Sequence, residues 1–444
     1  MRSNQTTSPS RLEFVQVGSR RYTLIVLTAY FALAHLDRQV LAVTLSPIGR
    51  EFALSDIQLG LLSGLAFAVL FSTLGLPLAL AVSSLNRRNV IAITIAVWSA
   101  MTMLCGLAQN FWQLFLARVG VGVGEAGALP ASHAIISDRY EPRERAGAMG
   151  VFMSGANIGT ALALVGGGFV AQFFGWRAAL LLAGLPGLVL AGIIRLTVPE
   201  PPRPHDDAGR ATLRLSLLSE TVAKIFRAPP MALMVLATVL NTITTFGMVA
   251  WLPTFLVREH GMVLSAVGLY LAAAIGVAGA LGTMFGGQLA GRLALWRAHW
   301  IAWTPAVILL LTKPFAIAGL LAGSKATALL LLLVPCALGA VYIAPTIAVL
   351  HAALRSEERP VGSALLLFGM NMIGMVLGPL IVGAVSNGFD ASGGSLGAGL
   401  VAVQAFGITG AIVFLVAGWT IGAAPEEREP QQGPATSTQA AARR

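Results

Sequence analysis

Four ionisable residues stand inside long apolar stretches of this sequence: Asp37, Arg38, Arg118 and Glu125. Two are acids and two are bases, so the set is electrically neutral if all four side chains meet. An unpaired charge in apolar surroundings is unfavourable, and each of these groups must therefore reach an opposite charge or water. A carboxylate beside an arginine can remain a fixed ion pair, or it can gain and lose a proton when its surroundings change.

The spacing of these residues predicts how they pair. Arg118 and Glu125 are seven residues apart, so they share one face of a helix, about two turns from each other. Asp37 and Arg38 are adjacent and diverge by about 100° around their helix, so they cannot pair side by side. We expect each to face a partner of opposite sign on the other helix.

These predicted pairs have two interpretations. One interpretation is a pair of structural ion bridges. The other is a proton-sensitive substrate site, in which protonation of either acid frees an arginine for an anionic ligand.

The second half of the chain shows no comparable set of charges within its apolar stretches, and its candidates are polar and uncharged. A cavity with ionic chemistry on one half and a weakly polar, mainly apolar wall on the other would suit an amphipathic anion. The candidate lining residues are His35, Asn157, Asn241, Thr245, Tyr270, Tyr342 and Asn371. For most of the polar groups in the second half, hydrogen bonds between helices are the alternative interpretation. For His35 the alternative is a spectator role.

The elements that carry these residues are membrane-spanning helices. Only 11% of the 444 residues are Asp, Glu, Lys or Arg, 56% are hydrophobic, and the mean hydropathy is +0.79. A soluble domain has roughly 25% charged residues. At about 20 residues per crossing, the apolar runs predict an all-α membrane protein with twelve transmembrane helices. These helices are predicted at 22–45, 57–82, 90–108, 112–137, 146–173, 177–196, 231–256, 265–290, 298–316, 325–351, 361–386 and 397–422.

The basic residues predict the orientation. Of the 29 Lys and Arg residues, 22 fall on the side of the membrane that holds both chain ends. Basic loops remain in the cytoplasm, so we expect both termini there. The net charge of +10 is then explained by the basic residues of the cytoplasmic loops, and no nucleic-acid partner is expected. Five basic residues are assigned to the opposite side: Arg50, Arg177, Arg258, Lys313 and Lys325.

The order of helices and polar segments predicts two bundles. We expect a cytoplasmic tail at 1–21, a six-helix bundle at 22–196, a cytoplasmic linker at 197–230, a second six-helix bundle at 231–422 and a disordered cytoplasmic tail at 423–444. The linker is rich in proline and ends in an amphipathic stretch around Leu213–Phe226. Two bundles related as repeats are typical of secondary transporters, which bind substrate at the midplane between them.

Several motifs argue against other kinds of chemistry. Residues 122–127 match G-x-G-x-x-G, but a dinucleotide site needs that pattern between a strand and a helix, whereas here it falls within a predicted span. Its glycines are better explained by close helix packing. The histidines and the two cysteines show no metal-ligand spacing. We expect no enzyme activity, no metal and no cofactor other than a proton gradient.

At these residues the chain resembles the major facilitator superfamily. The resemblance rests on Leu36-Asp37-Arg38-Gln39, on Leu54-Ser55-Asp56-Ile57-Gln58-Leu59-Gly60, on Arg118 followed by Gly122-Val123-Gly124-Glu125-Ala126, and on Gly175-Trp176-Arg177. It covers nearly all of residues 20–422, with the specific motifs in the first half. The Asp-Arg pair combined with Gly-Glu-Ala is most similar to bacterial members of the Spinster-like branch.

The resemblance implies a function and a set of roles. It implies the major facilitator fold and a proton-linked or facilitative carrier whose animal relatives move lysophospholipids or sphingosine-1-phosphate. Asp37 matches the favoured proton carrier, and Arg38 and Glu125 match residues thought to couple protonation to opening. We expect a monomeric secondary transporter of an amphipathic or lipid-like anion. Two alternatives remain open: a proton-coupled symporter of small organic anions such as sugar acids, and a non-transporting receptor or intramembrane enzyme.

The sequence departs from the superfamily pattern in the loops that gate its cytoplasmic side. The candidate gating residues are Arg87, Arg88 and Arg292. Ser83 and Ser84 stand where an Asp-Arg pair is usual, and Gly291 replaces the acid of the second copy. Loss of both acids weakens the brace that holds the outward-open state, so we expect an inward-facing bias at rest.

Overall fold

The computed structural model describes residues 17–82, 85–200, 215–355, 357–388 and 396–423, and its regular structure there is entirely helical. The first half contains α1 (Arg20–Glu51), α2 (Asp56–Gly60), η1 (Leu61–Leu65), α3 (Ala66–Val82), α4 (Arg87–Leu107), α5 (Phe111–Glu125), α6 (Ala128–Arg139), α7 (Pro142–Leu162), η2 (Ala163–Gly167) and α8 (Gly168–Thr197). The second half contains α9 (Leu215–Arg227), α10 (Pro229–Arg258), α11 (Leu264–Leu271), η3 (Ala272–Ala278), α12 (Gly279–Ala294), α13 (Trp300–Leu320), α14 (Lys325–Leu338), α15 (Ile343–Ala353), α16 (Arg359–Gly369), η4 (Met370–Met375), α17 (Val376–Gly388) and α18 (Leu396–Ala423).

These elements join into segments long enough to cross a membrane. Eleven apolar helical segments qualify among the described residues, and one of them, Arg143–Thr197, is 55 residues long. This long segment reverses at Gly175, whose φ of 83° lies in the region that favours glycine. It therefore counts as two crossings, which gives the twelve spans that the apolar runs predict. The all-α membrane fold is confirmed.

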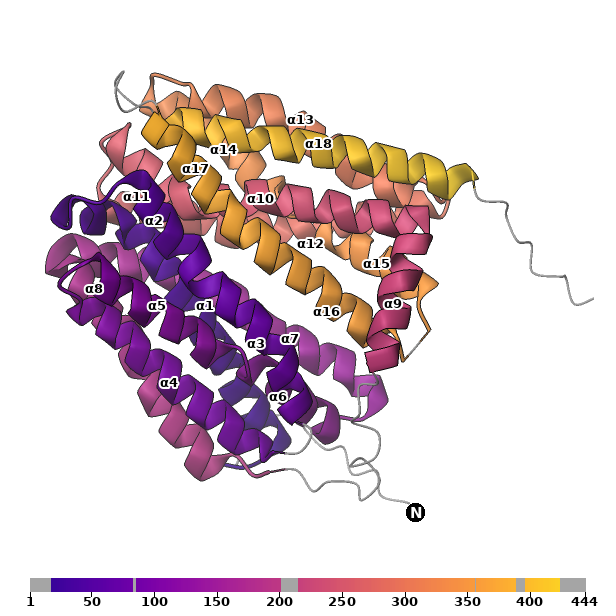
Figure 1. Ribbon diagram of the computed structural model, residues 1–444, viewed down its shortest axis with the longest axis horizontal. Coiled ribbons are helices and arrows are strands. Elements are labelled where there is room, and N and C mark those ends of the chain that lie inside the picture. Colours follow the sequence, from indigo (N-terminus) through magenta and orange to yellow (C-terminus); the bar gives the residue numbers. More distant parts are fainter. Residues whose placement is uncertain (1–16, 83–84, 201–214, 356, 389–395, 424–444) are drawn as a thin grey trace, which may run out of the picture.

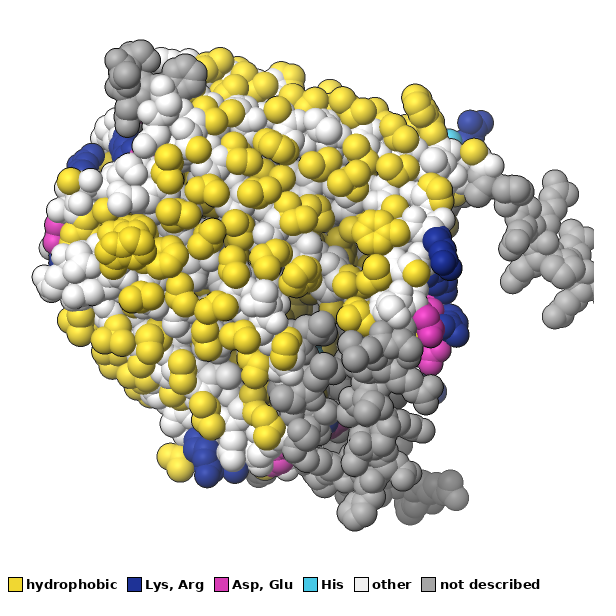
Figure 2. All heavy atoms as spheres, viewed as in Figure 1, with side chains coloured by type: hydrophobic (Ala, Val, Ile, Leu, Met, Phe, Trp, Pro, Cys, Tyr) yellow, Lys and Arg dark blue, Asp and Glu magenta, His cyan; other side chains and the backbone are white. Residues whose placement is uncertain are grey.

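The twelve spans form two bundles that lie side by side in Figure 1. Helices α1 to α8 make the first bundle, in indigo to magenta, and α10 to α18 make the second, in rose to yellow. Apolar side chains cover most of the flank seen in Figure 2, while the coloured charged side chains lie near its margins. This distribution is expected of a surface that faces lipid. The predicted tails at 1–21 and 423–444 fall mostly outside the described residues, as do linker residues 201–214 and Ser83 and Ser84.

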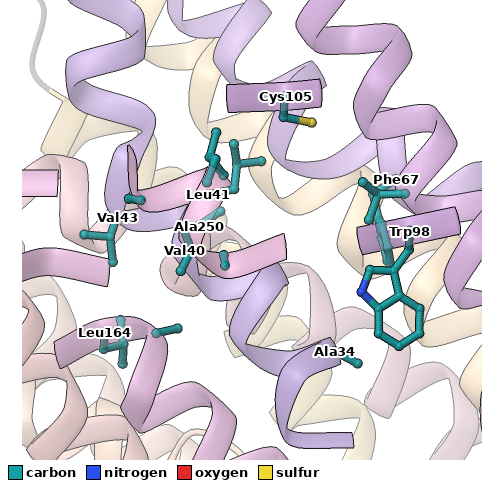
Figure 3. Close-up of a cluster of buried hydrophobic side chains, with 14 of the residues drawn as sticks. Ala34, Val40, Leu41, Val43, Phe67, Trp98, Cys105, Leu164 and Ala250 are labelled. Atoms are coloured by element: carbon teal, nitrogen blue, oxygen red, sulfur yellow. The ribbon is translucent and has the colours of Figure 1, made fainter. Parts of the chain in front are cut away.

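Apolar side chains from both bundles meet in the interior. Figure 3 shows Ala250 of α10 beside Val40 and Leu41 of α1, in one continuous cluster of buried side chains. Two glycines allow a closer approach, because a Cβ at Gly60 or Gly64 would lie only 2.7 or 2.6 Å from a carbonyl oxygen of the second bundle. Small residues at such crossings let membrane helices pack backbone to backbone.

A polar latch joins the bundles on the side opposite the two chain ends. Arg258, at the end of α10, donates to Asp56, at the start of α2, over 2.6 Å. The other Asp56 carboxylate oxygen accepts from Ser386 at 2.7 Å, and the Asp56 backbone N–H donates to Asn387. Because these bonds hold the two bundles together on this side, they oppose the state that is open on this side. The resting preference itself stays a prediction.

We predict that Asp56→Ala opens this side. Hydrogen bonds to a charged group contribute about 1.5–3 kcal/mol each, so losing even one of the two to the Asp56 carboxylate should raise the ratio of open to closed molecules on this side by about 10- to 100-fold. Spin labels on cysteines placed at the exposed residues Leu107 and Leu321, with Cys105 and Cys336 replaced by alanine, would report the distance between the bundles. Glu51→Ala is the matched control, because Glu51 pairs with Arg177 inside the first bundle. An unchanged distance distribution in Asp56→Ala would contradict the latch.

A second polar cluster attaches the linker helix to the second bundle. Lys224 of α9 donates to Glu358 at 2.8 Å, and Arg355 donates to the same carboxylate at 2.9 Å. Hydrogen bonds from Arg355 and Lys224 hold the pKa of Glu358 well below its usual range. Beneath them Ile225 packs among Leu350, Leu354 and Leu366. Of the amphipathic stretch expected near Leu213–Phe226, the described part from Leu215 onward is a helix that covers the end of the second bundle (Figure 1).

Candidate functional site

The four charges of the first bundle form two ion pairs between α1 and α5. In the first pair, Arg118 donates to Asp37 over 3.1 Å, and both side chains are almost fully buried. Thr102 of α4 donates to the other carboxylate oxygen of Asp37. Both oxygens of this acid are therefore occupied, which is typical of a fixed structural pair.

The second pair differs in its exposure and in its hydrogen bonding. Arg38 donates through Nε to Oε2 of Glu125 over 2.8 Å and also through a terminal nitrogen. The Arg38 side chain is 23% exposed, whereas Glu125 is 2% exposed. Oε1 of Glu125 is buried and has no hydrogen-bond partner among the described residues. Arg38 also lies over the rings of Phe67 and Phe71, 4.8 and 4.7 Å from their centres. This pair thus joins a partly accessible cation to an acid with one unoccupied oxygen.

Glu125 is the last residue of α5 and lies within one continuous membrane span. The sequence predicts one helix over 112–137, and a single span, Phe111–Arg139, confirms it. The two residues between α5 and α6, Ala126 and Gly127, keep right-handed helical backbone angles. Close packing explains the glycines here: a Cβ at Gly124 would lie 2.6 Å from the backbone nitrogen of Trp98. Glu125 therefore lies inside the span, where its helix packs closely against α4.

A cavity of about 470 Å³ lies in the second bundle, apart from these pairs. None of the four paired residues lines it. Its walls come from α10, η3, α12, α13, α14 and α18, with one residue, Asn157, from the first bundle. The polar members of the lining are Asn157, Asn241, Thr244, Thr245, Thr283, Thr312, Lys313 and Gln404. The sequence-based expectation of a cavity lined by the four charges does not describe this space.

Lys313 corrects the expectation for the second bundle. We expected it outside the membrane, opposite the chain ends, but it lies within α13, about two turns before that helix ends. It is 7% exposed, and its Nζ donates to Oε1 of Gln404 over 3.2 Å. A lysine at the bilayer centre costs about 2.5–3.5 kcal/mol on insertion scales. One feature of the sequence could have revealed this position. The apolar run continues past Lys313 to Leu321, and a span of that length has the lysine inside it.

The other candidate lining residues divide into two groups. Asn157, Asn241 and Thr245 do line the cavity. His35, Tyr270, Tyr342 and Asn371 do not. Tyr270 donates to the backbone oxygen of Leu329 at 2.7 Å, and the hydroxyl of Tyr342 is shared with Thr242 and Thr245. His35 packs on Phe31, with ring centres 4.5 Å apart, and Asn371 lies in η4. Hydrogen bonding between helices explains both tyrosines.

The candidate gating arginines lie near the side of the chain ends. The backbone N–H groups of Arg87 and Arg88 donate to Glu200 at 2.9 and 2.8 Å. These bonds satisfy two of the N–H groups that have no partner within the first turn of α4. The side chain of Arg87 pairs with Asp138 of α6. Arg292 is exposed in the last turn of α12. The described bonds of Arg87 and Arg88 therefore stay within the first bundle.

Comparison with known proteins agrees with this architecture. A family model described as Major Facilitator Superfamily matches residues 27–379. An MFS-type efflux pump of Mycolicibacterium smegmatis is 30% identical over 401 residues, which cover 88% of this chain and 91% of the relative. The sphingosine-1-phosphate transporter SPNS2 of Mus musculus is 30% identical over 246 residues, 53% of this chain and 43% of the relative.

A solved structure extends the similarity to the whole fold. It is a bacterial homologue of the human lysosomal transporter Spinster, in an inward-facing, unoccupied conformation. It superposes with a TM-score of 0.81 at 28% identity, covering 90% of this chain and 97% of that one. The family model, the relatives and the two-bundle fold agree, and the chain belongs to the Major Facilitator Superfamily, as a Spinster-like multi-pass membrane transporter.

Proposed function

We propose that this chain is a proton-coupled secondary transporter that moves an amphipathic or lipid-like anion by alternating access. It would act as a monomer in a bacterial inner membrane, with both termini in the cytoplasm and the proton gradient as its energy source. The observation that carries the proposal is Glu125, a buried acid with one oxygen bound by Arg38 and the other oxygen without a partner. Such an oxygen is where a proton can be added without first breaking a hydrogen bond.

Protonation of Glu125 would change the charge of the pair and hence the contact between α1 and α5. While Glu125 is ionised, the pair is neutral and Arg38 is held against α5. Once Glu125 carries a proton, Arg38 keeps its charge but loses most of the attraction, which is strong in a medium of low dielectric. The guanidinium is then free to move toward the open space that it already partly contacts. A shift in this contact can bias the two bundles toward the other access state.

The substrate class is supported by the lining of the cavity. Alongside its amides, hydroxyls and Lys313, the cavity is lined by apolar side chains such as Met248, Leu252, Ile275, Met284 and Leu309. A molecule with one polar end and one apolar part matches both kinds of surface. The name of the mouse relative, a sphingosine-1-phosphate transporter, is consistent with such a molecule.

The test is uptake into proteoliposomes that contain the purified full-length chain. Labelled lysophospholipids and sugar acids would be offered with an imposed pH gradient, and again after a proton ionophore has collapsed it. We expect gradient-dependent movement of a lysophospholipid and none of D-galactonate. Gradient-dependent movement of D-galactonate alone would favour the alternative function, the transport of small organic anions. Movement that ignores the gradient would contradict proton coupling.

A further inference from the structure

Lys313 is a buried cation without an acidic partner. No carboxylate lies within 4.0 Å of its ammonium group among the described residues, whereas Arg38 and Arg118 each have one. Its described hydrogen bond goes to Oε1 of Gln404, a neutral acceptor. An ammonium group has three donors, so two remain for other acceptors. A lysine with a purely structural role would be expected to satisfy these donors with nearby carbonyls or an acid.

The groups around Lys313 leave a recognition surface open on the cavity. The hydroxyls of Thr244 and Thr312 donate to the backbone oxygens of Val403 and Leu309, so their donors are already used. The side-chain oxygen of Asn241 is buried and has no partner among the described residues. The lining therefore offers one unneutralised positive charge together with a spare acceptor. That set is complementary to an anionic substrate that also carries a hydroxyl.

The cavity lies in the second bundle and reaches the first bundle at one residue. Lys313 on α13 and Gln404 on α18 belong to the second bundle, while Asn157 on α7 closes the cavity from the first. A ligand held there would touch elements that move relative to each other when access alternates. The site is also separate from the ion pairs of Asp37 and Glu125, so binding and proton transfer involve different residues.

We infer that Lys313 binds the anionic group, a phosphate monoester or a carboxylate, of the transported substrate, in a site completed by Gln404, Asn241 and Asn157. The inference rests on the proposed function, because it names the site at which that function meets its substrate. The apolar part of the substrate lies along Met248, Leu252 and Ile275. In this arrangement the second bundle selects for negative charge, while the first bundle responds to protons.

Cys336 provides a natural reporter for this site. It lines the cavity and is partly buried, whereas Cys105, the other cysteine of the chain, is fully buried between helices. The purified full-length chain would be treated with N-ethylmaleimide at constant pH, with no gradient. Two probes share one acyl chain: 1-lauroyl lysophosphatidate, which is anionic, and 1-monolauroylglycerol, which is neutral. Each is titrated to find the concentration that halves the rate of Cys336 modification, and Cys336→Ala identifies the labelled thiol.

The expected result is charge-selective protection. In Lys313→Gln the half-protecting concentration of the lysophosphatidate should rise about 10- to 100-fold, the range for loss of a charge-assisted hydrogen bond. That of monolauroylglycerol should change by less than about threefold, within the scatter expected of a single neutral contact. Lys313→Arg should retain protection by the anion, which shows that the site remains folded. Lys325→Gln is the matched control, since Lys325 is exposed at the start of α14.

Three outcomes would overturn the inference. They are equal loss of protection by both probes in Lys313→Gln, wild-type protection by the lysophosphatidate in that variant, and absence of any ligand-protected modification of Cys336 in the wild type. Failure of the proposed function has a different signature. If protection of Cys336 depends on Lys313 but uptake does not depend on the pH gradient, the anion site stands and proton coupling is rejected. If uptake depends on the gradient but protection does not depend on Lys313, proton coupling stands and the anion site is rejected.

Discussion

Replacing Arg118 with leucine is expected to destabilise the folded transporter by about 3–5 kcal/mol, the usual effect of removing one partner of a buried ion pair. Asp37 would be left as a buried acid with the hydroxyl of Thr102 but no cation beside it. The loss would be measured as the free energy of unfolding in mixed micelles of a mild and a denaturing detergent. Function is not needed for this measurement, so it isolates the structural role of the pair.

A double variant provides the control for this prediction. When Asp37→Leu is combined with Arg118→Leu, no buried charge remains, and most of the lost stability should return, because an apolar pair often replaces a buried ion pair with little loss. The double-mutant cycle then gives the interaction between the two side chains. A wild-type unfolding free energy for Arg118→Leu alone would show that the pair is not structural. If the stable double variant keeps full gradient-driven transport, Asp37 is not required for proton transfer.

Glu125→Gln should abolish the dependence of transport on the proton gradient while leaving substrate exchange intact. Glutamine has the shape of the protonated acid and can still accept from Arg38, but it cannot bind and release a proton. If one proton moves per cycle, a gradient of one pH unit corresponds to about 1.4 kcal/mol, which can support a tenfold ratio of substrate concentrations across the membrane. In Glu125→Gln we expect the substrate ratio to be the same with and without the pH gradient. Counterflow of substrate at equal pH should continue.

The matched control is Glu144→Gln. Glu144 also pairs with an arginine, Arg20, at 2.6 Å, but both side chains are about half exposed at the surface. Exposed ion pairs contribute little to stability, so transport by this variant should depend on the proton gradient as it does in the wild type. If Glu125→Gln keeps the full response to the gradient, the proton is carried elsewhere. If it also stops counterflow, the role of Glu125 is structural.

Together these variants test whether two acids that look alike in the sequence have different roles. Asp37 has both oxygens occupied, by Arg118 and Thr102, whereas Glu125 has one oxygen without a partner. The resemblance to the Spinster-like branch favours the helix 1 acid as proton carrier, but this geometry favours Glu125. The Glu125→Gln and Asp37→Leu/Arg118→Leu measurements decide between them.

The sequence by itself predicted the fold and the pairing of the first bundle. Long apolar runs predict helices that cross a bilayer, because an unpaired backbone in lipid is too unfavourable for irregular structure. Four charges within those runs predict two ion pairs, since helical spacing places Arg118 and Glu125 on one face and separates Asp37 from Arg38. Both inferences depend only on local periodicity and on the high free energy of buried charge.

Only the tertiary structure decided what surrounds each of these groups. Whether an acid keeps a free oxygen depends on a side chain from a third helix, Thr102 in the case of Asp37. Whether Lys313 lies outside the membrane or against a cavity depends on how far α13 extends and on what α10 and α18 place beside it. A residue's position along its own helix follows from the neighbouring residues in the chain. Its partners, its exposure and the empty space beside it are set by segments up to hundreds of residues away, whose packing no local pattern encodes.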